Sequence, residues 1–352
     1  MLPRCLASIR DLVDEIVVVD TGSTDGSPRI AAEFGARVFN VEWRDDFAGA
    51  RNAALDRARG RFILYIDADE RAGPYSREAL AGQLADPGVV ASTVRFRPRT
   101  GFTRYRECRL FRNDPRIRFR NVIHETMVPD IDAVTRSDGL RLAHSDLTID
   151  HFGYDGNQDA KHRRNVPLLR DRLARDPDHV YSWNHLGHAL AGLGDVDGAL
   201  GAWWRAVEVV RALGVRSALD RLPFGSLLLY PAAAAEAGPL LVEALERFDG
   251  DYLFRWLHGR RLAGDGRPSE AIPLFEGLTA IDATTFCADN GVAYDARIFG
   301  IFSYDALALC HFRLARYEES ARYYALAESV EPENPVHRVK RQLATACLAR
   351  RA

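Results

Sequence analysis

The stretch EIVVVDTGSTDGS, residues 15–27, decides the fold of the first half of this chain. Its apolar run ends on the acid Asp20 and passes into a loop of glycine, hydroxyl and acidic residues, after which a helical pattern begins at Ser27. Gly22 and Gly26 permit tight turns and a close approach of the backbone to a ligand. Any strand-to-helix turn favours such residues, so the loop alone is compatible with a structural turn as well as with a binding site.

The composition is that of a globular protein large enough for two domains, with 352 residues of which 47% are hydrophobic. The chain has 47 basic and 49 acidic residues, so no global field attracts nucleic acid, and we expect no nucleic-acid partner. Its five cysteines are scattered and form no C-x-x-C pair, which indicates a reducing, cytoplasmic location. We expect no secretory signal and no transmembrane segment, because the most apolar stretch, residues 222–245, is interrupted by proline and glutamate.

The sequence pattern changes near residue 175. In residues 1–175, short apolar runs alternate with helical patterns, which predicts an α/β domain with a mainly parallel sheet. The runs at 15–20 and 61–67 lack a period of two, as strands covered on both faces should. The longer, more polar runs at 89–100 and 105–114 are expected to be antiparallel strands at one edge.

Residues 176–352 consist of alanine-rich helical pairs, which predicts an all-α domain of tetratricopeptide-like repeats. The repeat between residues 180 and 210 is defined by Trp183, Leu186, Gly187, Ala199, Trp203 and Ala206. Weaker copies contain Gly259, Ala271 and Phe275, and then Tyr304, Leu307, Ala308, Tyr324, Ala327 and Pro332. Small residues let paired helices approach closely, and aromatic residues fill the space between pairs. Residues 211–248 are expected to form a divergent pair, and a helical bundle with coincidental alanines is the alternative.

Acidic residues lie where two of the expected strands end. Ligands of open parallel sheets bind beyond the carboxyl ends of the strands, where Asp20 and Asp67 are expected. Asp67 and Asp69 of YIDADE are two residues apart, so they project to the same side of an extended chain. Mg²⁺ and Mn²⁺ bind through one or two carboxylates and take their other ligands from substrate phosphates. A solvated acidic turn is the alternative.

The order of these motifs resembles the family-2 glycosyltransferases with the nucleotide-diphospho-sugar transferase (GT-A) fold. IVVVDTGSTDGS and FAGARNAALDRARGRFILYIDADE carry the likeness, which continues through CRLFRNDPRIRFRNVIHE and IDHFGYDGNQDAKHRRNVPLL. The trailing repeats resemble a bacterial subgroup that combines both parts. The resemblance implies a metal-dependent, inverting hexosyltransferase that uses Mn²⁺ or Mg²⁺ and a nucleoside-diphosphate sugar, by family association a UDP-sugar. It implies a peptide, protein or cell-envelope glycan as acceptor, while the repeats could select that acceptor or mediate a homodimer.

The resemblance also implies roles for residues in the donor site. Asp20, in the loop with Ser23, would contact the nucleoside, and Asp67 and Asp69 would hold the ribose and the metal-bridged diphosphate. Arg51 and Asn52 match the helix that faces the nucleotide-sugar, with a helix-surface arginine and a capping or solvent-facing asparagine as the alternative. Lys161 and Arg164 follow on a later helix and could close over the phosphates.

Two histidines and one glutamate complete the implied site. His151 would complete the metal site or bind diphosphate, with a structural histidine as the alternative. Inversion needs a base for the proton of the acceptor, and Glu125 of VIHE is favoured because it follows a long β segment. His124 would orient this base or contact phosphate, unless it is a buried, satisfied histidine. The rival bases are Asp114, Glu70 and Glu107.

Family members usually begin with one more strand than the residues that follow Met1 provide. We therefore expect a central parallel strand to be absent from this sequence, with a start codon assigned too late as the favoured explanation. Replacement by another segment or a degenerate enzyme are the alternatives. The competing function is a protein-binding module built on a catalytically degenerate transferase domain. A glycoside hydrolase is disfavoured, because its two acids must flank the scissile bond roughly 5–10 Å apart.

Overall fold

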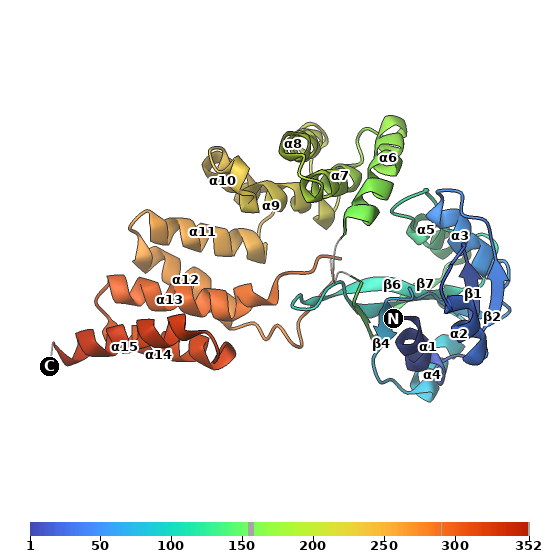
Figure 1. Ribbon diagram of the computed structural model, residues 1–352, viewed down its shortest axis with the longest axis horizontal. Helices are drawn as coiled ribbons and strands as arrows, with labels where there is room; N and C mark the ends of the chain where they lie inside the picture. The colour runs from blue at the N-terminus through green and yellow to red at the C-terminus, as the bar shows by residue number, and fades with distance from the viewer. Residues whose placement is uncertain (154–157, 290, 351–352) are drawn as a thin grey trace. The chain divides into compact units, whose positions relative to one another are not determined.

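The computed structural model describes residues 1–153, 158–289 and 291–350, which form two compact units (Figure 1). The first unit contains Met1–Thr100, Arg104–Ala212 and Ala288–Gly291. The second contains Gly101–Thr103, Leu213–Cys287 and the chain from Val292 onward. The first helical pair of the repeat region therefore packs within the same compact unit as the α/β part, and the expected division after residue 175 remains a prediction.

The first unit is an α/β structure extended by helices, as expected. Its elements are α1 (Leu2–Ile9), β1 (Val17–Asp20), α2 (Ser27–Glu33), β2 (Arg37–Asn40), α3 (Phe47–Leu55), β3 (Phe62–Leu64), β4 (Glu70–Ala72), α4 (Arg77–Ala85), β5 (Val89–Arg97), β6 (Arg104–Arg112), α5 (Val128–Asp138), β7 (Arg141–His151), α6 (Asp159–Arg175), α7 (Val180–Gly192) and α8 (Val196–Leu213). The short strand β8 (Cys287–Ala288) contributes Ala288 to this unit.

The sheets are mixed, whereas the sequence favoured a mainly parallel sheet. The order β3-β6-β5-β7-β4 combines a parallel β5–β7 pair with antiparallel β3–β6, β5–β6 and β4–β7 pairs. The parallel pair β1–β2 forms a separate two-stranded sheet. Within the described residues, β1 pairs with β2 alone, which leaves its four residues half-buried instead of covered on both faces.

Two apolar clusters cover opposite faces of the longer sheet, because successive residues of a strand point to opposite sides. Phe111 belongs to a cluster with α3 and α5, and its neighbour Leu110 belongs to a cluster with α1 and α4. These clusters place α3, which carries Arg51, against the sheet at the end where the acidic residues follow β3.

The helical pair α7–α8 has the expected tetratricopeptide arrangement of a small residue facing an aromatic ring. A Cβ atom at Gly187 of α7 would lie 2.3 Å from the indole nitrogen of Trp203 on α8, so only glycine permits this approach. The same indole nitrogen donates a hydrogen bond to the carbonyl of Asn184 at 3.1 Å. Close packing therefore rests on the two residues that defined the repeat in the sequence.

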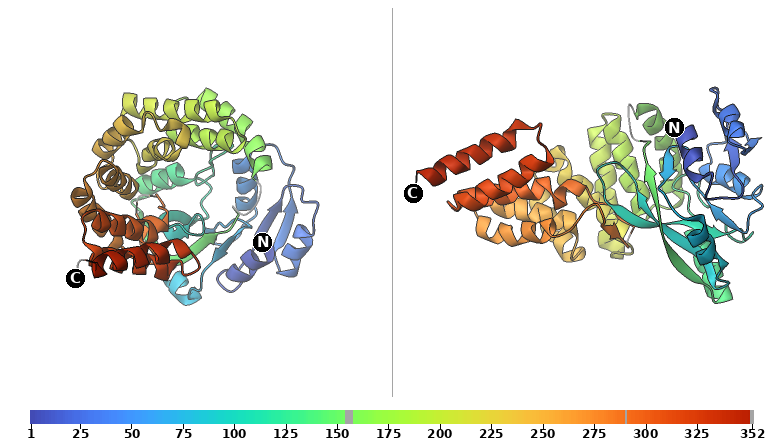
Figure 2. Two further views of the ribbon diagram at one scale, coloured as in Figure 1. Left: turned by 60° about the vertical axis from the view of Figure 1, so that its left-hand side comes forward. Right: turned by 90° about the horizontal axis from the view of Figure 1, so that it is seen from below.

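The second unit consists of helices stacked in sequence order (Figures 1 and 2). Its elements are η1 (Ala218–Arg221), α9 (Leu222–Leu229), η2 (Pro231–Ala233), α10 (Ala237–Arg247), α11 (Tyr252–Gly264), α12 (Pro268–Thr279), η3 (Ala296–Phe299), α13 (Ile301–Arg313), α14 (Tyr317–Val330) and α15 (Pro335–Ala349). The short pair α9–α10 occupies the stretch in which a divergent pair was expected. Across the described parts of the chain, no helix is both long and apolar enough to cross a bilayer.

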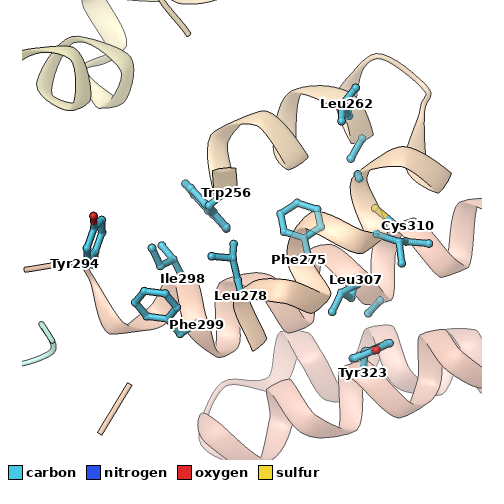
Figure 3. Packing of buried hydrophobic residues seen from close by; sticks show 14 of the residues in the cluster. Trp256, Leu262, Phe275, Leu278, Tyr294, Ile298, Phe299, Leu307, Cys310 and Tyr323 are labelled. Carbon is cyan, nitrogen blue, oxygen red and sulfur yellow. The ribbon is translucent and has the colours of Figure 1, made fainter. Parts of the chain in front are cut away.

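The core of the second unit repeats the glycine-to-aromatic contact. A Cβ atom at Gly259 of α11 would lie 2.8 Å from the ring of Phe275 on α12, which is fully buried. Figure 3 shows Phe275 among Leu307 of α13, Tyr323 of α14 and the surrounding apolar side chains. The expected tetratricopeptide-like region is thereby confirmed as a series of packed helical pairs.

Candidate functional site

Helix α3 presents Arg51 to the acidic segment that follows β3. The helix begins after Asp46, whose Oδ1 accepts a hydrogen bond from the backbone N–H of Gly49 at 2.9 Å. The backbone N–H of Phe47 donates to the carbonyl of Val122 at 3.0 Å, which ties the start of α3 to the loop that carries Glu125. The sequence therefore orients Arg51 through a helix cap and a long-range backbone contact.

Arg51 joins two carboxylates that are far apart in the sequence. Its Nη1 and Nη2 lie 2.8 and 3.0 Å from the two carboxylate oxygens of Asp67, and its Nε donates to Oε1 of Glu125 at 2.7 Å. The guanidinium lies over the rings of Tyr65 and Phe119, 5.1 and 5.4 Å from their centroids. Burial opposes the charge of Asp67, but the Arg51 guanidinium outweighs burial and holds the pKa of Asp67 below its usual value.

Asp69 lies beside His151, at the end of β7. The His151 Nε2 is 3.2 Å from Asp69 Oδ2, while its Nδ1 lies 3.0 Å from the carbonyl oxygen of Pro98, an acceptor that selects the Nδ1–H form. The hydrogen bond from His151 lowers the pKa of Asp69, with burial opposing it. Burial disfavours a charged His151, but Asp69 outweighs burial and raises the pKa of His151.

Gly153 leaves open the space in front of this pair. A Cβ atom at residue 153 would lie 1.9 Å from Asp69 Oδ2 and 2.9 Å from His151 Nε2. Ligand atoms on a small octahedral cation are roughly 3 Å apart, since metal–oxygen distances are about 2.1 Å. The separation of Asp69 and His151 and the glycine beside them therefore fit a divalent cation. No cluster of three or more such ligands occurs among the described residues, so the other ligands would come from the substrate and water.

Glu70 and Arg109 form a buried ion pair under the site. Arg109 donates to both carboxylate oxygens of Glu70 at 2.8 and 3.0 Å and to Glu107 at 3.3 Å. Glu70 is 1% exposed, and burial raises its pKa to about 7 against the opposing charge of Arg109. Glu70 Oε2 accepts the backbone N–H of Asp67 at 2.8 Å, so this pair supports the DADE segment.

Arg109, Gly153 and the carbonyl of Pro98 were missed by sequence reasoning. Arg109 directly precedes the apolar pair Leu110 and Phe111, and a charge in such a run could have indicated a buried partner. Gly153 follows His151 closely, but a glycine after a strand is too common to indicate a ligand site.

Asp20 and Ser23 form a separate cluster at the end of β1. The Asp20 carboxylate accepts the backbone N–H groups of Gly22 at 3.1 Å and Ser23 at 3.0 Å. The hydroxyl of Ser23 is the main cause of the lowered pKa of Asp20. The carboxylate thus shapes its own loop, in which Gly22 has φ of 111°, a value that favours glycine.

The remaining residues of the expected site have different environments. Asn52 uses its side-chain amide to pair with the backbone of Phe119, at 2.8 and 2.9 Å, and His124 packs its ring against α7. Lys161 and Arg164 lie in the first turns of α6. Burial lowers the pKa of Lys161 while the charge of nearby Asp69 opposes this, and the Arg164 guanidinium lies 5.0 Å from the ring centroid of Phe47.

Comparisons with known proteins indicate the family of the first part of the chain. Residues 1–151 match the family described as Glycosyl transferase family 2. A TPR repeat-containing protein of Synechococcus elongatus is 39% identical over 207 residues, which cover 56% of this chain and 51% of that protein. The SPbeta prophage-derived glycosyltransferase SunS of Bacillus subtilis is 27% identical over 195 residues, covering 51% of this chain and 43% of that protein. The lipopolysaccharide core biosynthesis glycosyltransferase LpsC of Rhizobium meliloti is 31% identical over 164 residues, covering 42% and 60%.

The first part of the chain thus has the sequence of a transferase domain, and the family implies a nucleotide-sugar donor. Residues 1–151 are a glycosyltransferase family 2 domain, and a tetratricopeptide-like helical region follows, which confirms the expected family and fold. The chain spans about half the length of the first two curated relatives named above.

Proposed function

We propose that this chain is a metal-dependent, inverting hexosyltransferase that uses a nucleoside-diphosphate sugar, with a UDP-sugar as the favoured donor. The observation that carries the proposal is the Arg51 guanidinium, which binds both Asp67 and Glu125. Asp69, two residues after Asp67, pairs with His151 in an arrangement suited to a cation. The proposed acceptor is a peptide, protein or cell-envelope glycan, which the helical repeats help to select.

The donor half of the site has an acidic and a basic side. Asp69 and His151 would hold Mn²⁺ or Mg²⁺, and the bound cation would stabilise the charge of the departing nucleoside diphosphate. Lys161 and Arg164 of α6 would place positive charge near the same diphosphate. Asp67, held by Arg51, would contact the ribose, and the loop of Asp20 would face the nucleoside.

Glu125 is the best candidate for the catalytic base among the four acids considered. Glu70 is 1% exposed and has both oxygens on Arg109, so an acceptor hydroxyl cannot reach it. Glu107 shares Arg109, and Asp114 is bound by Arg116 near the surface. The side chain of Glu125 keeps 14% of its surface exposed, and because Arg51 contacts Oε1, the second oxygen would take the proton from the acceptor.

Release of UDP from a panel of UDP-sugars with Mn²⁺ tests the proposal. We expect Asp69→Ala and His151→Ala to reduce turnover and the calorimetric affinity for UDP with Mn²⁺. Asp146→Ala is the matched control, because Asp146 lies on β7 with a side chain 77% exposed. Wild-type turnover equal to that of Asp69→Ala would exclude the metal mechanism, and unchanged binding in His151→Ala would remove His151 from the metal site.

A further inference from the structure

The loop of residues 121–125 holds Glu125 in a closed backbone ring. Arg120 and Thr126 form an isolated antiparallel bridge, with reciprocal backbone hydrogen bonds of 2.9 and 3.1 Å. The carbonyl of Val122 accepts the N–H of Phe47, and Ile123 is 4% exposed in the core. The loop is therefore anchored on both sides, and Glu125 lies next to the bridge residue Thr126.

The backbone of the loop is strained at the residue before Glu125. His124 has φ of 53° and Asn121 has φ of 76°, both in the left-handed region. Such conformations are unfavourable for non-glycine residues and persist where surrounding contacts impose them. We therefore expect a contact of the His124 side chain to help hold this conformation.

That contact comes from the first helix of the repeat region. The ring of His124 packs against Tyr181 and His185 of α7, with centroid separations of 4.8 and 4.3 Å, and the latter two rings are 4.3 Å apart. Tyr181 and His185 are four residues apart and so share one face of α7. These three rings, which we call the ring triad, lie within the first compact unit.

We propose that Tyr181 and His185 are positioning residues for Glu125, so that the first helical repeat is a working part of the transferase site. This inference rests on the proposed function and extends it. The ring triad holds His124 in its left-handed conformation, and the adjoining Glu125 is thereby directed to Arg51. Without the triad the strained residue relaxes, and the carboxylate leaves the position from which it takes the proton.

The consequence is specific to the chemical step. The rings of Tyr181 and His185 pack against His124, which adjoins Glu125, so the triad acts on the candidate base more directly than on Asp67 or Asp69. A displacement of about 1 Å in a reacting group can reduce turnover by roughly 100-fold. Loss of the triad should therefore lower kcat and leave KM for the donor unchanged.

The test compares full-length variants with UDP-glucose or UDP-N-acetylglucosamine, whichever the wild type turns over faster with Mn²⁺. We expect Tyr181→Ala and His185→Ala to lower kcat by about 10- to 100-fold, with KM and the UDP affinity within about twofold of wild type. Tyr181→Phe keeps the ring and should restore activity. Glu208→Ala on α8, where the side chain is 58% exposed, is the control and should resemble wild type.

A second pair of measurements separates positioning from folding. His124→Gly adopts a positive φ without strain and without the ring, so adding it to Tyr181→Ala should recover part of the lost kcat. Amide hydrogen exchange should accelerate at Arg120 and Thr126 in Tyr181→Ala and stay unchanged in β5 and β6. A kcat of Tyr181→Ala/His124→Gly no higher than that of Tyr181→Ala, or unchanged exchange at the bridge, would overturn the inference. A wild-type chain that neither binds nor turns over a UDP-sugar would instead refute the proposed function, while the exchange measurement would still test the role of the triad.

Discussion

Removing Arg109 tests whether the buried pair under the site supports the first unit. Glu70 is 1% exposed in the intact protein, and Arg109→Met removes two hydrogen bonds of 2.8 and 3.0 Å from its carboxylate. Removal of one partner from a buried ion pair costs about 3–5 kcal/mol, because an uncompensated charge remains. The guanidinium also lies 4.4 and 4.5 Å from the ring centroids of Tyr65 and Phe96, contacts that add to the loss.

The loss should depend on pH in a defined direction. Burial already raises the pKa of Glu70 from 4.5 to about 7 in the intact protein, and removing Arg109 takes away a charge that opposes this rise. A carboxyl group with a raised folded-state pKa contributes stability that is fully present below its unfolded pKa and is lost as pH rises through the folded value. The deficit of Arg109→Met should therefore be largest near pH 8 and shrink towards pH 5, where Glu70 is protonated.

Urea unfolding at pH 5 and pH 8 measures this deficit. Amide hydrogen exchange of β5 and β6 is the probe, because both strands belong to the first unit. Arg109→Met/Glu70→Gln should recover most of the lost stability, because the buried charge is gone. Arg116→Met is the control: its side chain is 50% exposed, and surface pairs contribute about 0–1 kcal/mol. An equal deficit at both pH values, without recovery in the double variant, would refute the reasoning.

Three further variants test the site and its surroundings. Gly153→Ala places a Cβ 1.9 Å from Asp69 Oδ2 and should weaken calorimetric binding of Mn²⁺ with UDP by about 10- to 100-fold, while Gly82→Ala, in open space, should bind as wild type. Arg51→Lys loses the bidentate contact with Asp67, so kcat/KM for the donor should fall by roughly 10- to 150-fold. This range corresponds to about 1.5–3 kcal/mol, the contribution of a hydrogen bond to a charged group. An unchanged kcat/KM would contradict the bridging role of Arg51. Burial lowers the pKa of His185 to about 3, so the unfolded chain binds a proton at this residue more readily than the folded chain. The free energy of unfolding of the first unit should therefore fall by about 1.4 kcal/mol per pH unit as pH decreases below 6.5. In urea unfolding of His185→Phe, this contribution to the pH dependence should be absent.

Much of the fold was predictable because its elements have local patterns. The apolar run before Asp20, the hairpin of β5 and β6 and the repeat built on Gly187 and Trp203 are visible in short stretches of sequence. Strand pairing was predicted less well: alternation of strands and helices favoured a parallel sheet, whereas β7 pairs parallel with β5 and antiparallel with β4. Local periodicity does not specify which strand edges meet.

The candidate site shows the same division. The spacing of Asp67 and Asp69 identified the acidic segment, and the sequence also supplied Glu125 and His151 as candidates. Their partners were not apparent, because Arg51 and Glu125 are 74 positions apart and meet only through the packing of α3 and the closed loop. The same packing explains why the side-chain amide of Asn52, a predicted donor contact, hydrogen-bonds the backbone of Phe119.

The sequence by itself determined the class of protein: an α/β transferase domain with an acidic strand end, followed by paired helices. Those features depend on residue spacing and turn chemistry within short segments, which a chain carries before it folds. The tertiary structure decided that Arg51 joins Asp67 to Glu125, that His151 directs Nε2 to Asp69, and that α7 packs against the loop of Glu125. These contacts join segments distant in sequence, and close packing of the cores, rather than any local pattern, selects them.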